Sequence, residues 1–186
     1  MRKVALLCLL VLLALGSAGA GYALWSETLY INGTVNTGHV DAEWTFVGCF
    51  DIESKDVGET SGEIDALDPQ ILHFTIDNGY PCYTGDCQVE YTYYGSIPAI
   101  VESITFLPGQ GLTNCSVNQS ASTGSFVATC DQLTITFGNG LKTELHEDDF
   151  VASSVRVHVE QAADQTTEYE FSVEIELVQW NESIWY

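Results

Sequence analysis

The feature that most constrains the fold of this chain is an alternation in which every second side chain is apolar. It is clearest in EYEFSVEIEL (residues 168–177), where the odd-numbered positions are apolar and the even-numbered positions are Glu or Ser. A period of two is typical of a β-strand with one buried and one exposed face. Related patterns predict further strands in HVDAEWTFVG (39–48), ILHFTID (71–77), QVEYTYY (88–94), AIVESITF (99–106), LTITF (133–137) and SVRVHVE (154–160).

Segments rich in Gly, Pro and Asn separate these runs, and they predict turns: DNGYPC, YYGSIP, LPGQG and FGNG. No window of 11 or more residues has a clear helical period. The best helical candidate is ELHEDDFVASS (residues 144–154), which would form about one turn. Many short strands joined by such turns predict a single all-β domain, an antiparallel β-sandwich.

Residues 1–23 have the composition of a signal peptide. Arg2 and Lys3 precede the apolar run 4–15, and small residues follow. Cleavage after Ala20 or after Ala23 would satisfy the preference for small residues at the cleavage site. The apolar stretch is also just long enough for an uncleaved membrane anchor, but its Gly- and Ala-rich end favours cleavage. We expect a secreted or cell-surface protein whose contact with a membrane is limited to this leader.

Removal of the leader leaves 26 acidic residues against three basic ones, a net charge of −23. Such a charge repels nucleic acids and anionic lipids, excludes them as partners, and attracts cations. The acidic loop 51–65 holds the candidate Ca²⁺ ligands Asp51, Glu53 and Asp56, because Ca²⁺ prefers oxygen ligands on flexible loops. Their spacing does not match an EF-hand, and a solvated loop without metal is the alternative. We expect no other cofactor.

Five cysteines follow the leader, and disulfides are permitted in an exported chain. Cys82 and Cys87 enclose the short turn YTGD, and Cys115 and Cys130 flank a loop rich in Ser and Asn, so these two pairs are expected. Cys49 would then be a free thiol or pair between chains. A Cys49–Cys82 bridge is the alternative pairing. No C-x-x-C pair is present, so a structural zinc site is not expected.

Sites for N-linked glycans follow the pattern N-x-S/T. The number of these sequons in an exported chain predicts surface glycosylation. The four candidate residues are Asn32, Asn114, Asn118 and Asn181.

No motif of a known enzyme class is present: the sequence has no G-x-S-x-G, no phosphate-binding glycine loop and no H-E-x-x-H. His73 and His158 occupy outward positions of predicted strands. His146 is followed by three acidic residues and is the candidate metal ligand of a secreted metallopeptidase, although the further ligands and the base of such a site are missing. We therefore predict no catalytic residue and no enzymatic activity.

Four segments, in order, resemble the TasA/camelysin-like family of exported bacterial and archaeal proteins, which carry a SipW-type signal peptide. They are GYALWSETLYINGTVNTGHVDAEW (21–44), NGYPCYTGDCQVEYTYYGSIPAIVESITF (78–106), SSVRVHVEQAADQ (153–165) and YEFSVEIELVQWNE (169–182). The resemblance implies a jelly-roll sandwich and cleavage just after GYA, so that the mature chain would begin at Leu24. Some relatives bear a metalloprotease label, but this sequence departs from any metalloprotease pattern.

The family resemblance also implies a function. Its members form pili or biofilm-matrix fibres when each subunit donates an N-terminal strand to the next one. Residues 24–38 would be the donor strand, and residues 39–186 the sandwich. The donor's anchors would be Trp25, Leu29, Ile31 and Val35, which share one face of an extended strand.

Donation of this kind makes other copies of the same chain the partners, in a head-to-tail polymer. Glu27 and Gly33 interrupt the row of anchors, and Gly33 would let two backbones approach closely. The main alternative is a monomeric surface protein whose N-terminal strand folds back into its own sandwich. A secreted metallopeptidase with His146 in its site is a further alternative.

Overall fold

The computed structural model describes residues 2–20, 28–53 and 57–185. The chain divides into two compact units, one reaching from the N-terminus to Asn36 and one beginning at Thr37. The first unit contains the helix α1 (Arg2–Ala20), whose Leu- and Ala-rich sequence favours a helix. Within the described ranges, no helix has the combination of length and hydropathy that a membrane-spanning segment needs.

The remainder of the first unit contains no strand in its described part. Residues 28–36 are exposed and belong to none of the sheets. The sequence predicted a strand over 24–38; residues 24–27 lie outside the described ranges, and residues 28–38 form no strand. An extended segment becomes a strand only when another strand satisfies its backbone groups, and no strand of the described sheets pairs with residues 28–38.

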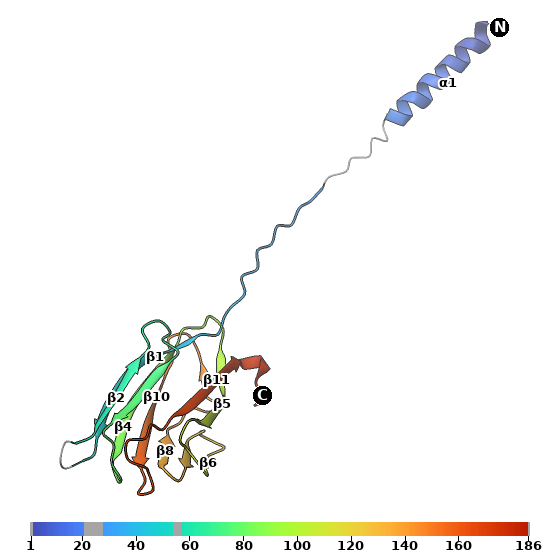
Figure 1. Ribbon diagram of the computed structural model, residues 1–186. Coiled ribbons are helices and arrows are strands. Elements are labelled where there is room, and N and C mark those ends of the chain that lie inside the picture. Colours follow the sequence, from blue (N-terminus) through green and yellow to red (C-terminus); the bar gives the residue numbers. More distant parts are fainter. Residues whose placement is uncertain (1, 21–27, 54–56, 186) are drawn as a thin grey trace. The chain divides into compact units, whose positions relative to one another are not determined.

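The second unit is an all-β sandwich, and its larger layer is a six-stranded sheet. All neighbouring strands in this sheet are antiparallel. Figure 1 shows β1, β4 and β10 side by side in this layer. In spatial order its strands are β1 (Ala42–Asp51), β4 (Thr84–Tyr93), β10 (Phe150–Val159), β8 (Leu133–Phe137), β7 (Phe126–Thr129) and β6 (Ser116–Gln119).

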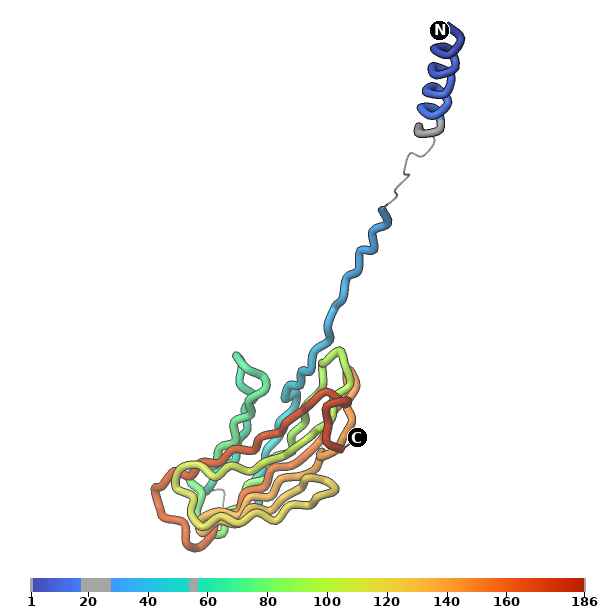
Figure 2. The backbone as a smooth tube through the Cα atoms, turned by 90° about the vertical axis from the view of Figure 1, so that its right-hand side faces the viewer, coloured from blue at the N-terminus to red at the C-terminus, as the bar shows by residue number. Residues whose placement is uncertain are grey.

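The second layer consists of two separate antiparallel sheets. One has the order β11-β5-β9, and the other is the hairpin of β2 and β3. Figure 2 shows the red β11 running beside the yellow-green β5. The bounds of these strands are β2 (Glu59–Ile64), β3 (Leu72–Asp77), β5 (Ala99–Pro108), β9 (Glu144–Leu145) and β11 (Phe171–Gln179), and a 3₁₀ turn, η1 (Trp180–Glu182), follows.

The core lies between the two layers and is built from the alternate apolar side chains of the strands. Phe106 of β5 meets Phe126 of β7 at a ring-centroid distance of 5.8 Å, and Phe126 stacks on Phe137 of β8 at 5.7 Å. The same alternation buries every second residue of β8 and β10, and all of these except Ser153 are apolar: Leu133, Ile135, Phe137, Val151, Ser153, Val155, Val157 and Val159. The prediction of an antiparallel β-sandwich is therefore confirmed.

The helical candidate over 144–154 is not helical, and this prediction was wrong. The region contains β9, a turn and the first half of β10. In the turn, the Asp149 carboxylate accepts a hydrogen bond from the His146 backbone N–H at 2.8 Å. From Phe150 onward the backbone pairs with β4, and this tertiary pairing outweighs the weak local preference for a helix.

The two disulfides join Cys49 to Cys87 and Cys115 to Cys130. The second is an expected pair, whereas the expected Cys82–Cys87 bridge and its alternative, Cys49–Cys82, are both wrong. Cys49 lies directly opposite Cys87 in the β1–β4 ladder, with their Cα atoms 4.0 Å apart. Cys82 is an exposed free thiol, and so is Cys8 in α1. Register between distant strands, rather than closeness in sequence, therefore sets the pairing. Two disulfides are typical of proteins in an oxidising, extracellular environment.

Candidate functional site

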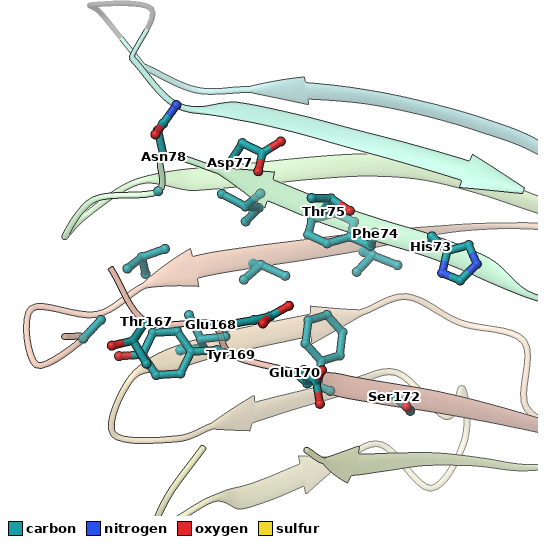
Figure 3. A pocket seen from close by; sticks show the side chains of 18 of the residues that line it. His73, Phe74, Thr75, Asp77, Asn78, Thr167, Glu168, Tyr169, Glu170 and Ser172 are labelled. Atoms are coloured by element: carbon teal, nitrogen blue, oxygen red, sulfur yellow. The ribbon is translucent and has the colours of Figure 1, made fainter. Parts of the chain in front are cut away.

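A long open groove separates the two sheets of the second layer. β3 forms one wall, and β11 with the loop before it forms the other (Figure 3). The main part of the groove has a volume of about 1260 Å³. Its floor is the six-stranded sheet, which contributes the inward side chains of β8 and β10: Leu133, Phe137, Val155, Val157 and Val159. Buried apolar core residues thus form the bottom of the gap between two strands of the same layer.

The groove continues past the start of β3. A second hollow of about 740 Å³ shares Trp44, Gln70 and Val173 with the first and runs along β11 to Leu177. Trp44 fixes the junction, because its backbone N–H donates to the Pro69 carbonyl at 2.9 Å and its Nε1–H donates to the Gln70 carbonyl at 3.0 Å. The groove therefore runs along β11 from Phe171 to Leu177.

The β11 wall is an unpaired strand edge. Glu170 directs both its backbone groups to the β5 side, since its N–H donates to Gln110 and its carbonyl accepts from Gly109, each at 2.9 Å. Successive residues of a strand direct these groups to opposite sides. The backbone N–H and C=O groups of Phe171, Val173 and Ile175 consequently face the groove, where the described sheets contain no partner strand. Their side chains point into the core.

The edge of β3 that faces the groove is also unpaired. The Ile71 carbonyl accepts a hydrogen bond from Asp65 on the β2 side at 3.0 Å. By the same alternation, the backbone groups of Leu72, Phe74 and Ile76 face the groove, and the half-buried side chains of these residues pack on the core. Two strand edges with unsatisfied backbone groups therefore face each other across an apolar floor.

The two walls run in opposite directions. In Figure 3, His73 near the start of β3 lies on the side of Ser172, whereas Asn78 after the end of β3 lies on the side of Thr167. The residues that line the groove indicate the same directions. Gln70, which precedes β3, and the later part of β11 line the same second hollow. A strand placed between β3 and β11 must therefore run parallel to one of them and antiparallel to the other.

One aromatic contact crosses the groove. The rings of Phe74 on β3 and Phe171 on β11 lie 6.3 Å apart, and Phe171 also packs on Phe106 of the core at 6.2 Å. Because these two rings contact each other across the groove, a residue inserted between them has to be small.

A hydrogen-bonded cluster lies at the Asn78 end of the groove. Tyr80, which lines the groove, donates its hydroxyl to the Glu53 carboxylate at 2.7 Å. The other oxygen of this carboxylate accepts from the backbone N–H groups of Val57 and Gly58. The hydrogen bond from Tyr80 lowers the pKa of Glu53 most, and the bonds from the Val57 and Gly58 N–H groups lower it further. The bond between Tyr80 and Glu53 also raises the pKa of Tyr80 to about 12. The Glu53 carboxylate thus connects the acidic loop 51–65 to Tyr80 in the lining of the groove.

We expect Tyr80 to ionise about two pH units later than an ordinary tyrosine in an ultraviolet titration. Its pKa is raised in the folded state, so its contribution to stability is complete below about pH 10 and is lost as the pH rises through 12. In Glu53→Gln the pKa of Tyr80 should return toward 10, and Tyr80→Phe should remove one tyrosine from the late step, to which the raised pKa values of Tyr83, Tyr91 and Tyr93 also contribute. An unchanged late step in Glu53→Gln would show that the Glu53 contact does not raise the pKa.

Three of the four expected anchor residues are described, and all three are exposed. Leu29, Ile31 and Val35 have 89%, 98% and 88% of their surface exposed, and Trp25 lies outside the described ranges. An apolar residue with nine-tenths of its surface exposed has no stabilising contact of its own. The same chain thus holds an exposed row of apolar side chains and an open groove with an apolar floor.

The structure describes two of the three candidate Ca²⁺ ligands, Asp51 and Glu53. Asp51 accepts a hydrogen bond from Tyr83 at 3.3 Å, Glu53 is bound as described above, and Asp56 lies outside the described ranges. In the part of the chain that the structure describes, no three His, Cys, Asp or Glu side chains form a group that could hold a metal ion. His146, the candidate metal ligand of the metallopeptidase alternative, is exposed, and its Nε2 atom lies 3.5 Å from Oε1 of Glu144.

The four glycosylation candidates are all exposed: Asn32, Asn114, Asn118 and Asn181. Asn114 donates its side-chain N–H to Asp131 at 2.6 Å, and the other three lie in the N-terminal segment, in β6 and in η1. Exposure is what an N-linked glycan requires, and occupancy stays a prediction.

Sequence reasoning identified the groove residues only as core-facing positions of two strands. The alternation in ILHFTID and EYEFSVEIEL correctly turns Leu72, Phe74, Phe171 and Val173 inward. It contains no information on which strand edges stay unpaired, because side-chain patterns report faces rather than edges.

Comparison with known proteins identifies no relative, since no family model, curated protein or solved structure matches this chain. The fold and the groove alone define its class, an all-β sandwich with one layer open between two strand edges.

Proposed function

We propose that this protein is the structural subunit of an extracellular filament, a pilus or biofilm-matrix fibre, in which the N-terminal segment of each subunit fills the groove of the next. The observation that carries the proposal is the pair of unpaired edges on β3 and β11 above an apolar floor. In the same chain, residues 28–36 are exposed and unpaired, with apolar side chains at alternate positions. A strand of that pattern suits such a groove.

The physical gain from filling the groove has two parts. Main-chain hydrogen bonds would satisfy both edges, each contributing on the order of 1 kcal/mol. Burial of Leu29, Ile31 and Val35 would add about 1.5–3 kcal/mol each if they leave water completely. An exposed strand edge is also a template for unwanted aggregation, and an inserted strand removes that hazard.

The proposed contact is between two different surfaces, a segment and a groove, so it is head-to-tail and generates an open filament. Disulfides in the sandwich agree with an oxidising compartment, and export through removal of residues 1–23 belongs to the proposal. The net charge of −23 after that removal opposes association. Salt screens such repulsion over about 10 Å at 0.1 M, so filament growth should speed up with ionic strength.

Deletion of residues 24–36 from the mature chain tests the proposal. Every residue of the hydrophobic core lies beyond this segment, so the shortened protein should fold, as circular dichroism would show. We expect the mature protein to form filaments by electron microscopy and the shortened protein to form none. Filaments that persist in the shortened protein would contradict the proposal. A mature protein that stays monomeric at high concentration and high salt would favour the monomeric alternative instead.

A further inference from the structure

The geometry points to a single direction and register for the inserted segment: antiparallel to β11, parallel to β3, with Gly33 of a neighbouring copy seated between Phe74 and Phe171. This inference rests on the proposed function and specifies how its partner binds. It assigns a specificity-determining role to Gly33.

The direction follows from where the chain joins its own sandwich. The stretch from Val40 to Trp44 lines one end of the groove, so the N-terminal segment leaves its own subunit at that end. In a head-to-tail filament the neighbour presents its opposite end, at Asn78 and Thr167, to the arriving segment. The Val35 side of the segment must then lie at the Asn78 end, and its Leu29 side at the Trp44 end. That direction is the direction of β3 and is opposite to β11.

Return of the segment into its own groove would require the other direction. The segment would enter at the Trp44 end with Val35 first and run antiparallel to β3 and parallel to β11. Because the two walls differ in direction, the orientation of the segment distinguishes donation to a neighbour from folding back.

The register follows from the contact between Phe74 and Phe171. Among the positions 29, 31, 33 and 35 that would face inward, only Gly33 has no side chain, and only such a residue fits where the two rings meet at 6.3 Å. Within its own chain a Cβ on Gly33 would meet nothing within 4 Å. The fold of the free subunit therefore gives no reason for a glycine here.

This register places the other apolar residues beside apolar wall residues. With Gly33 between Phe74 and Phe171, Ile31 lies between Leu72 and Val173. Val35 then lies between Ile76 and Tyr169, near the Asn78 end. All four wall residues are half-buried and border the groove, so each donor side chain finds an apolar neighbour on both sides.

Cysteine pairs test the direction and register in the mature chain, with Cys82→Ser to remove the free thiol. In the inferred register Asn32 lies opposite Ser172, and both side chains point outward. Ser172 directs its backbone groups to β5, so the new pair is of the non-hydrogen-bonded type with Cα atoms about 4.5 Å apart, within reach of a disulfide. Cys49 and Cys87 already form such a bridge between directly opposite residues.

The matched control moves one cysteine by two positions. In the reverse direction, with Gly33 still at Phe171, Thr34 would lie beside Ser172. Asn32→Cys and Thr34→Cys both abolish the same sequon, so the loss of a glycan is common to the two. We expect Asn32→Cys with Ser172→Cys to give a ladder of linked subunits on a non-reducing gel, and Thr34→Cys with Ser172→Cys to give none.

A link formed by the Thr34 pair instead, either between subunits or within one, would overturn the inference, and so would filaments that neither pair links. If the parent protein forms no filaments at all, the proposed function itself fails. As a second measurement, Gly33→Val should raise the concentration needed for assembly at least tenfold, and adding Phe74→Ala should reverse most of that rise. An assembly that Gly33→Val does not affect would contradict the register.

Discussion

Replacement of Ile31 by Asp is expected to leave the subunit folded and to abolish filament formation. Ile31 has 98% of its surface exposed in the single chain, so its replacement should cost the free subunit almost nothing. In the proposed filament it is buried between two walls, and an unpaired carboxylate there costs several kcal/mol. A loss of about 3 kcal/mol corresponds to a rise of roughly a hundredfold in the concentration required for assembly.

The measurement is the concentration of subunit that remains in solution after sedimentation of the filaments. Tyr30→Asp is the control, because it adds the same charge one position away, on the side of the segment that faces solvent. It should change the soluble concentration by a small factor only. If both variants assemble normally, or if both fail equally, the alternation of the segment has no role in assembly.

The second large effect is expected from loss of the disulfide between β1 and β4. Cys49→Ala with Cys87→Ala opens a loop with a sequence separation of 38, which should lower the free energy of unfolding by about 3–4 kcal/mol on chain-entropy grounds. Cys87 is also completely buried, so truncation of its side chain adds a small packing loss. Denaturant unfolding of the mature chain under oxidising conditions measures the change.

Cys82→Ser is the matched control. Cys82 is exposed, and its sulfur accepts a hydrogen bond from Gln161 at 2.9 Å that a serine oxygen can replace. This variant should unfold within about 0.5 kcal/mol of the parent. A loss comparable to that of the double variant would mean that Cys82 takes part in a bridge, as the sequence-based pairing expected.

The alternation of side chains predicted the strands of this protein well, because burial of one face is a local property of each strand. In β8 the predicted inward residues Leu133, Ile135 and Phe137 are all buried. The disulfides were harder, since Cys49 and Cys87 are brought together by the register of β1 on β4. The helical candidate over 144–154 failed for a related reason, because pairing with β4 decides its conformation.

The candidate site could be predicted only in part. The sequence identified an N-terminal segment with alternating apolar residues, and the family resemblance suggested a groove to receive it. The position of that groove depends on which strand edges stay unpaired. Phe74 on β3 and Phe171 on β11 occupy the same places in the side-chain pattern as ordinary core residues, so the pattern does not show that these edges are unpaired. The jelly-roll connectivity and the donation of the strand stay predictions.

The opposite directions of β3 and β11 have a mechanical consequence for any filament built in this way. A strand between them completes a mixed sheet, with a parallel ladder on the β3 side and an antiparallel ladder on the β11 side. Parallel pairing is slightly less stable per residue. Under tension, the joint between two subunits should therefore begin to separate along β3, while the ladder on β11 still holds the neighbouring subunit.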